Sequence, residues 1–99
     1  MYGFQLFSTF ESISALGIVD SQKYFSTRWC GMSEDLLRDY HRRGGANARV
    51  KPSVVARVRE RLAEVARLLP ELAAEVHEID AAIVQHMYVA DLLGRRSLR

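Results

Sequence analysis

The sequence contains a single cysteine, Cys30, and no long apolar run. One cysteine cannot form an internal disulfide, and without a CxxC pair or a Cys/His cluster there is no zinc-binding signature. No segment approaches the roughly 18 apolar residues that a membrane-spanning helix requires, and the N-terminus lacks the basic and apolar regions of a signal peptide. We therefore expect a cytoplasmic, all-α protein without metal, cofactor or membrane contact, in which Cys30 is buried and inert.

Motifs for catalysis are also missing. The three histidines, His41, His77 and His86, do not have metal-ligand spacing, and no Ser/His/Asp or paired-carboxylate motif is present. Gly44-Gly45 lacks the strand context and the lysine of a phosphate-binding loop. The sequence therefore favours a protein that is not an enzyme.

The formal net charge is only +2, but the charges are distributed unevenly along the chain. Residues 38–61 carry eight Lys and Arg against two acidic residues, a net charge of +6, whereas residues 71–91 carry five acidic residues and no Lys or Arg. The basic segment 38–61 and the acidic segment 71–91 predict two surfaces with different partners.

Three short helices are predicted before residue 44. Leu6, Phe10 and Ile13 have helical spacing over residues 4–16, and Gly17 follows where a left-handed cap is favoured. Ser21 is a suitable N-cap for a second helix over residues 22–30.

A sharp turn and a third helix are expected next. Gly31 permits the turn, and Ser33 is a suitable N-cap for a helix over residues 34–43. Leu36, Leu37 and Tyr40 lie on one side of this helix, and its charged residues point outward.

This segment resembles the helix-turn-helix domains of the phage-repressor class, the lambda repressor and Cro-like proteins. Ser21-Gln22, Ser26, Gly31 and Ser33 match the order of that motif, and the SQxxFSxxWxGxS core is similar to that of small uncharacterised bacterial and phage proteins. The stretch from Gln22 to Ser33 is one residue longer than is usual in the class, which implies an altered turn. The resemblance implies that Gln22 contacts a phosphate and that residues 33–42 face the major groove of double-stranded DNA.

The predicted DNA-binding residues combine this motif with the neighbouring basic cluster. They are Gln22, Lys23, Ser33, Glu34, Arg38, Asp39, Arg42, Arg43, Arg49 and Lys51. A simpler interpretation remains open, because Phe25, Trp29, Leu37 and Tyr40 would form the core of a small helical domain whether or not it binds DNA. Glu34 and Asp35 would repel phosphates, although a carboxylate can accept a hydrogen bond from cytosine.

The second half of the chain has a heptad pattern. Apolar residues recur at alternating steps of four and three from Val58 to Leu93, and Pro52-Ser53 suits a helix start. Pro70 interrupts the pattern and predicts a kink or a break. We therefore expect two regions, a helix-turn-helix domain over residues 1–52 and a long helix or helix pair for dimerisation over residues 53–99.

An unbroken helix of about 40 residues would extend about 60 Å, beyond the diameter of so small a domain. The apolar stripe should therefore be covered by another chain or by the helix folding back at Pro70, and we favour a homodimer. The predicted dimer interface contains Val65, Leu69, Leu72, Val76, Ile79, Ile83, His86 and Met87. His86 falls on the seam, where a polar residue can fix the register of a coiled coil.

Two functions remain for comparison with the structure. The first is a small dimeric DNA-binding transcriptional regulator of phage or mobile-element type, in which the third helix reads an inverted repeat. The second is an all-α dimeric interaction protein, such as an antiactivator or a phage-encoded inhibitor, which binds another regulatory protein through the acidic residues 71–80. An exposed basic face would favour the first.

Overall fold

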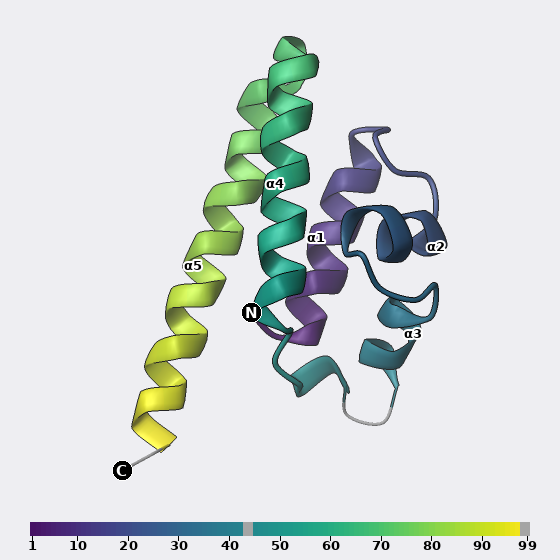
Figure 1. Ribbon diagram of the computed structural model, residues 1–99. Coiled ribbons are helices and arrows are strands. Elements are labelled where there is room, and N and C mark those ends of the chain that lie inside the picture. The colour runs from purple at the N-terminus through teal and green to yellow at the C-terminus, as the bar shows by residue number, and fades with distance from the viewer. Residues whose placement is uncertain (43–44, 98–99) are drawn as a thin grey trace.

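The computed structural model describes residues 1–42 and 45–97 of the chain (Figure 1). The α-helices are α1 (Gly3–Ala15), α2 (Gln22–Tyr24), α3 (Leu36–His41), α4 (Pro52–Leu68) and α5 (Ala73–Ser97). A π-helical turn, η1 (Phe25–Trp29), continues α2, and two 3-10 turns, η2 (Gly45–Asn47) and η3 (Pro70–Leu72), precede α4 and α5. The fold is all-α, as the sequence predicted, and no helix within these residues is both long and apolar enough to cross a bilayer.

The helices are arranged as an antiparallel hairpin against a smaller helical cluster (Figure 1). α4 and α5 form the hairpin, and α1 packs against α5 on one side and α3 on the other. The molecule measures 45 × 25 × 19 Å along its principal axes. One hydrophobic core extends from Leu6 to Ile83, so the regions on either side of the boundary predicted between residues 52 and 53 share that core.

The first helix and its cap agree closely with the pattern in the sequence. Leu6, Phe10 and Ile13 point into the core, and Gly17 adopts the predicted left-handed conformation with φ +78°. The backbone N–H of Tyr2 donates to Oε1 of Gln5 at 2.8 Å, which satisfies one free donor at the start of α1.

An aromatic cluster joins α1 to η1. The rings of Phe10 and Phe25 meet edge to face with centroids 5.4 Å apart, and Phe25 stacks on Trp29 at 6.0 Å. Such pairs add about 0.5–1.5 kcal/mol each beyond the area that they bury. Phe25 is fully buried and contacts both neighbours, so it links the two halves of the N-terminal cluster.

The second helix contains a widened turn. Ser21 Oγ accepts from the N–H of Tyr24, as an N-cap should, and the N–H of Cys30 then donates to the carbonyl of Phe25, five residues earlier. A π turn holds one more residue than an α turn. The additional residue noted between Gln22 and Ser33 is therefore accommodated at least partly within the helix, while residues 30–35 form the connection to α3.

The third helix is shorter than predicted. It spans Leu36–His41 rather than residues 34–43, and its N-cap residue is Asp35. Ser33 does not cap it with its side chain, and its carbonyl instead accepts from the N–H of Leu36 in a preceding turn. Arg42 has φ −105° and ψ 159°, an extended conformation that ends the helix.

Pro70 breaks the long heptad segment and does not merely kink it. Pro52 occupies the start of α4, as predicted, but Leu69 adopts φ −127° and ψ 76°, a non-helical conformation, in keeping with the bias against helix in the residue before a proline. The N–H of Leu72 donates to the carbonyl of Leu69 at 2.9 Å, and the chain then reverses into α5. The seam residues Val58 and Leu62 of α4 are consequently buried in the same core as Val76 and Ile83 of α5.

The hairpin covers most of the predicted dimer interface within a single chain. Val76 and Ile83 are each only 1% exposed within the single chain, and the other apolar members, Val65, Leu72, Ile79 and Met87, pack against the same core. His86 is partly buried, and burial together with the positive Met1 amino group lowers its pKa. Leu69 is exposed at the hairpin end. The fold-back at Pro70 therefore packs most of this seam within one chain and leaves Leu69 exposed.

The cysteine gives a simple test of this core. Cys30 is 1% exposed, and burial raises the pKa of its thiol to about 12. Because the thiolate is the reactive form, the native protein should react with a thiol-specific reagent at pH 8 only as the structure opens, and denaturant should accelerate the reaction. Rapid reaction of the native protein, measured by absorbance, would contradict this packing.

Candidate nucleic-acid interface

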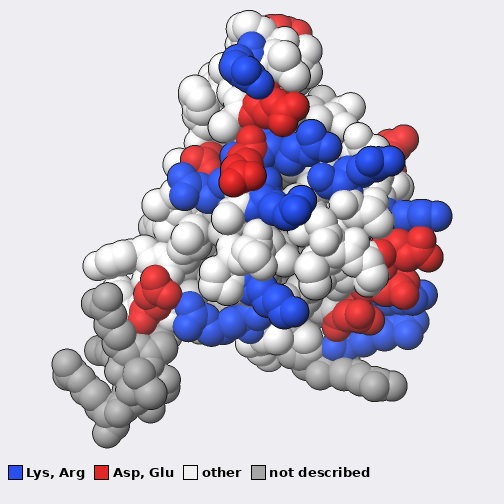
Figure 2. Space-filling model, in the orientation of Figure 1, with Lys and Arg blue, Asp and Glu red and all other residues white. Residues whose placement is uncertain are grey.

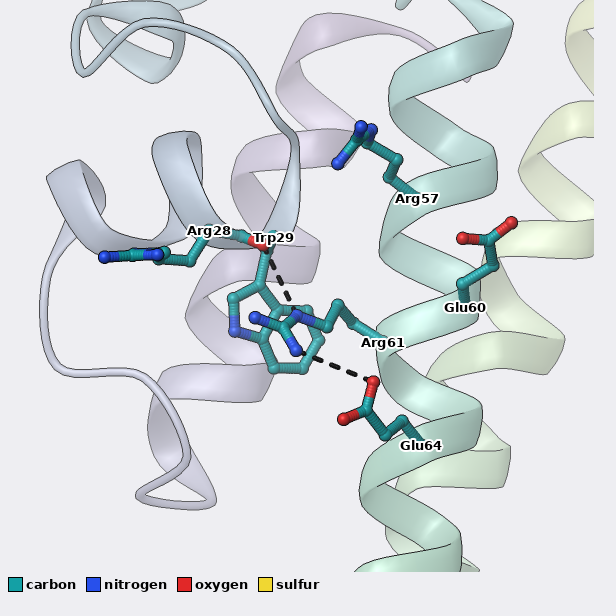
Figure 3. A pocket seen from close by; sticks show the side chains of 6 residues that line it. All are labelled: Arg28, Trp29, Arg57, Glu60, Arg61 and Glu64. Carbon is teal, nitrogen blue, oxygen red and sulfur yellow. Dashed lines mark hydrogen bonds and ion pairs between the residues drawn. The ribbon is translucent and has the colours of Figure 1, made fainter.

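Three arginines surround a cleft between η1 and α4 (Figure 3). The cleft has a volume of about 260 Å³ and is lined by Arg28, Trp29, Arg57, Glu60, Arg61 and Glu64. The four α4 residues follow each other at helical intervals of three, one and three, which places them on one side of that helix. The cleft therefore results from a charged stripe on α4 facing the π turn.

Arg61 connects the two walls of the cleft. Its Nε donates to the carbonyl of Arg28 at 3.3 Å, and its Nη1 lies 3.6 Å from Oε2 of Glu64. Arg61 thus has protein partners on both elements and holds η1 against α4.

Arg28 and Arg57 are exposed and differ from Arg61 in their partners. Within residues 1–42 and 45–97, neither has an acidic group at ion-pair distance. A desolvated or unpaired guanidinium on a cleft wall is well suited to a phosphate, because its planar fork matches two phosphate oxygens. These two arginines line the cleft without an acidic partner among the described residues, and Figure 3 shows the Arg28 side chain extending away from α4.

Gly31 controls the space beside Arg57. It has φ +67°, and a Cβ built there would lie 2.8 Å from both Cδ and Nε of Arg57. The side chain of Arg57 therefore lies directly against the turn after η1, and a side chain at residue 31 would displace it.

Substitution of Gly31 by alanine should both strain the turn and displace Arg57. A left-handed conformation costs a non-glycine residue about 1–2 kcal/mol, and the clash adds to this cost. Gly17→Ala is the matched control, because Gly17 also has positive φ but has no atom within 4 Å of an added Cβ. Urea unfolding should show the larger loss of stability for Gly31→Ala, and equal losses would show that Arg57 is not constrained by this turn.

Several of the predicted DNA-binding cations have acidic partners. Lys23 Nζ lies 3.3 Å from Glu34, Arg38 forms an ion pair with Asp35, and Arg49 Nη2 lies 2.9 Å from Asp91 on α5. All of these side chains are substantially exposed, and exposed pairs contribute only about 0–1 kcal/mol. The acidic partners thus reduce the local positive charge, but these weak ion pairs can be exchanged for other contacts.

The remaining predicted residues are distributed around the turn and the start of α4. Arg42 and Lys51 are exposed without an acidic partner in the described part of the chain, and Gln22, Ser33 and Asp39 are exposed. Arg43 lies outside the described residues. Figure 2 shows basic side chains spread over α4 and over the side of the molecule formed by α2 and α3, with acidic side chains between them.

The cleft arginines were not among the residues predicted from the sequence. Arg57 and Arg61 belonged to the basic segment, and their spacing of four placed them on one helix face, but Arg28 lies 29 residues before Arg57 and gave no local signal. Arg59 belongs to the opposite side of α4, where its Nε donates to Asp80 at 2.8 Å. That hydrogen bond raises the pKa of Arg59 and joins α4 to α5.

Comparisons with protein-family models, curated proteins and solved structures found no match to this chain. The function is therefore inferred from the geometry and the charges of the molecule itself.

Proposed function

We propose that the protein is a small DNA-binding transcriptional regulator that binds the phosphate backbone of DNA through the cleft between η1 and α4. The observation that carries the proposal is the placement of Arg28 and Arg57, two exposed arginines without acidic partners among the described residues, on the walls of one cleft. Arg42 and Lys51 supply further exposed positive charge at the end of α3 and before α4.

Phosphate binding follows from the chemistry of these groups. Each phosphate neutralised by Lys or Arg releases condensed counterions from DNA, which drives association at low salt. The exposed pairs of Lys23 and Arg38 can exchange a carboxylate for a phosphate at little cost, because neither pair is desolvated. Glu60 and Glu64 in the cleft limit the net attraction, so we expect moderate rather than indiscriminate binding.

In this proposal α3 supplies sequence preference. Arg38 and Arg42 are one helical turn apart, and both are exposed, as is Asp39 between them. Arginine can contact guanine O6 and N7 with about 1–3 kcal/mol of discrimination, whereas phosphate contacts supply none. Since α3 has only six residues, we expect it to read few base pairs and the cleft to provide most of the affinity.

The alternative is that this is an interaction protein that binds another regulatory protein instead of DNA. The acidic segment over residues 71–80 supports it, because Glu71, Glu75 and Glu78 are exposed on η3 and α5. An interaction protein of this kind would not need a basic cleft. Measuring whether the protein binds DNA therefore distinguishes the two functions.

The test is a fluorescence-anisotropy titration of mixed genomic duplexes from about 50 to 200 mM salt, where backbone contacts have their largest effect. We expect measurable binding at the lowest salt and a log–log slope of about −0.9 for each phosphate contacted. Selection and sequencing of the bound fragments would then give the operator. Undetectable binding at about 50 mM salt would reject the proposed function and favour the interaction protein.

A further inference from the structure

The outer face of α5 is apolar and is left uncovered by the described part of the chain. Val84, Tyr88 and Leu92 recur every four residues and are 44%, 63% and 39% exposed. Val89 and Leu93 lie beside them at 40% and 45%. Figure 1 shows α5 at the outer edge of the molecule, on the side of α4 away from α2 and α3.

This face is unusual because the opposite face of α5 is already buried. Val76, Ile83 and Ala90 point into the core with exposures of 1% or less. A helix that is apolar on both faces is normally covered on both faces. Gln85 and Asp91 are the polar exceptions among the exposed residues from 84 to 93, and Asp91 is paired with Arg49. The outer face therefore has the composition of an interface and not of a solvated helix surface.

We propose that a second copy of this chain covers the outer face, with the two α5 helices antiparallel. The distribution of charge along α5 favours a second copy of the chain as the partner. Glu75 and Glu78 lie near its beginning, whereas the sequence places Arg95 and Arg96 near its end. Antiparallel pairing brings the acidic start of each helix beside the basic end of the other, and parallel pairing would bring like charges together.

The same charges indicate the register. Glu78 and Arg95 are equally distant from the midpoint between His86 and Met87, so a two-fold axis near that point aligns them between copies. The exposed apolar residues Val84, Tyr88 and Val89 then lie around the axis. A two-fold interface uses one surface patch twice, and this patch is complementary to itself in both charge and apolar character.

This dimer is independent of the seam between α4 and α5 and of DNA binding. The seam stays within each chain, and the cleft of Arg28 and Arg57 lies on the η1 side of α4, away from the outer face of α5. Failure of DNA binding would leave the self-association intact, and failure of self-association would leave a monomeric DNA-binding domain.

The experiment is sedimentation of the full chain without DNA at tens of micromolar. We expect a dimer, and Tyr88→Glu should raise its dissociation constant at least about tenfold while circular dichroism remains helical. Tyr24→Glu is the matched control, because Tyr24 is also exposed but lies on α2, and it should remain dimeric. A monomeric wild-type protein, or a Tyr88→Glu dimer as tight as wild type, would overturn the proposal.

Charge reversal tests the orientation. The double variant Glu75→Lys and Glu78→Lys should weaken the antiparallel dimer, and adding Arg95→Glu and Arg96→Glu should restore it. In a parallel dimer the first pair of changes only replaces one like-charge contact by another. A double variant that dimerises as well as wild type would therefore overturn the antiparallel arrangement.

Discussion

Phe25→Ala is expected to lower the free energy of unfolding by about 3–5 kcal/mol. The side chain is fully buried and contacts Phe10 from α1 and Trp29 from the same π turn, so truncation leaves a cavity where three aromatic rings meet. Small domains are stable by about 5–15 kcal/mol, and the loss is therefore a large part of the total. Urea or thermal unfolding followed by circular dichroism measures it.

The preceding residue provides the control for this substitution. Tyr24 is 43% exposed and is adjacent to Phe25 in the chain, so Tyr24→Ala should change the stability by less than about 0.5 kcal/mol. Similar losses for the two variants would mean that the aromatic cluster does not hold α1 to η1.

Ile83→Asp is expected to unfold the chain. Ile83 is 1% exposed between α5 and the rest of the core, and no opposite charge lines that position among the described residues. Burying an isolated carboxylate costs several kilocalories per mole or forces it to take up a proton. The helical circular dichroism signal should be lost or strongly reduced even in dilute solution, because the contact is within one chain.

A charge on the outer face of α5 is expected to have little effect on folding. Val84→Asp changes the next residue, which is 44% exposed, and in solution dilute enough for the chain to be monomeric it should leave the helical signal and the melting temperature almost unchanged. If instead Ile83→Asp yielded a folded monomer, the heptad seam would be an interface between chains and the hairpin would be wrong.

Local patterns were sufficient to predict most of the helices. The spacing of Leu6, Phe10 and Ile13 predicted α1, and Gly17 and Ser21 marked the adjoining boundaries because their conformation or side-chain hydrogen bond is local. Pro70 predicted the interruption between α4 and α5 for the same reason.

Long-range features could not be read in the same way. The heptad seam has the same pattern whether a second chain or the same chain covers it, and only the reversal at Pro70 decides the question. The pair of Arg49 and Asp91 joins residues 42 positions apart, and the cleft joins Arg28 to Arg57 through the packing of η1 on α4. The end of α3 was also misjudged, because Arg42 adopts an extended conformation that periodicity alone does not indicate.

The central claim, DNA binding through the cleft, is tested most directly by comparing the salt dependence of Arg57→Gln and Arg59→Gln. The two residues are two positions apart on α4 and the substitutions remove the same charge, but Arg57 lines the cleft whereas Arg59 is bound to Asp80 on the opposite side. Titration of the same duplexes over a range of salt should show a slope reduced by about 0.9 for Arg57→Gln and unchanged for Arg59→Gln. Equal slopes and equal affinities for the two variants would contradict the cleft as the DNA-binding site.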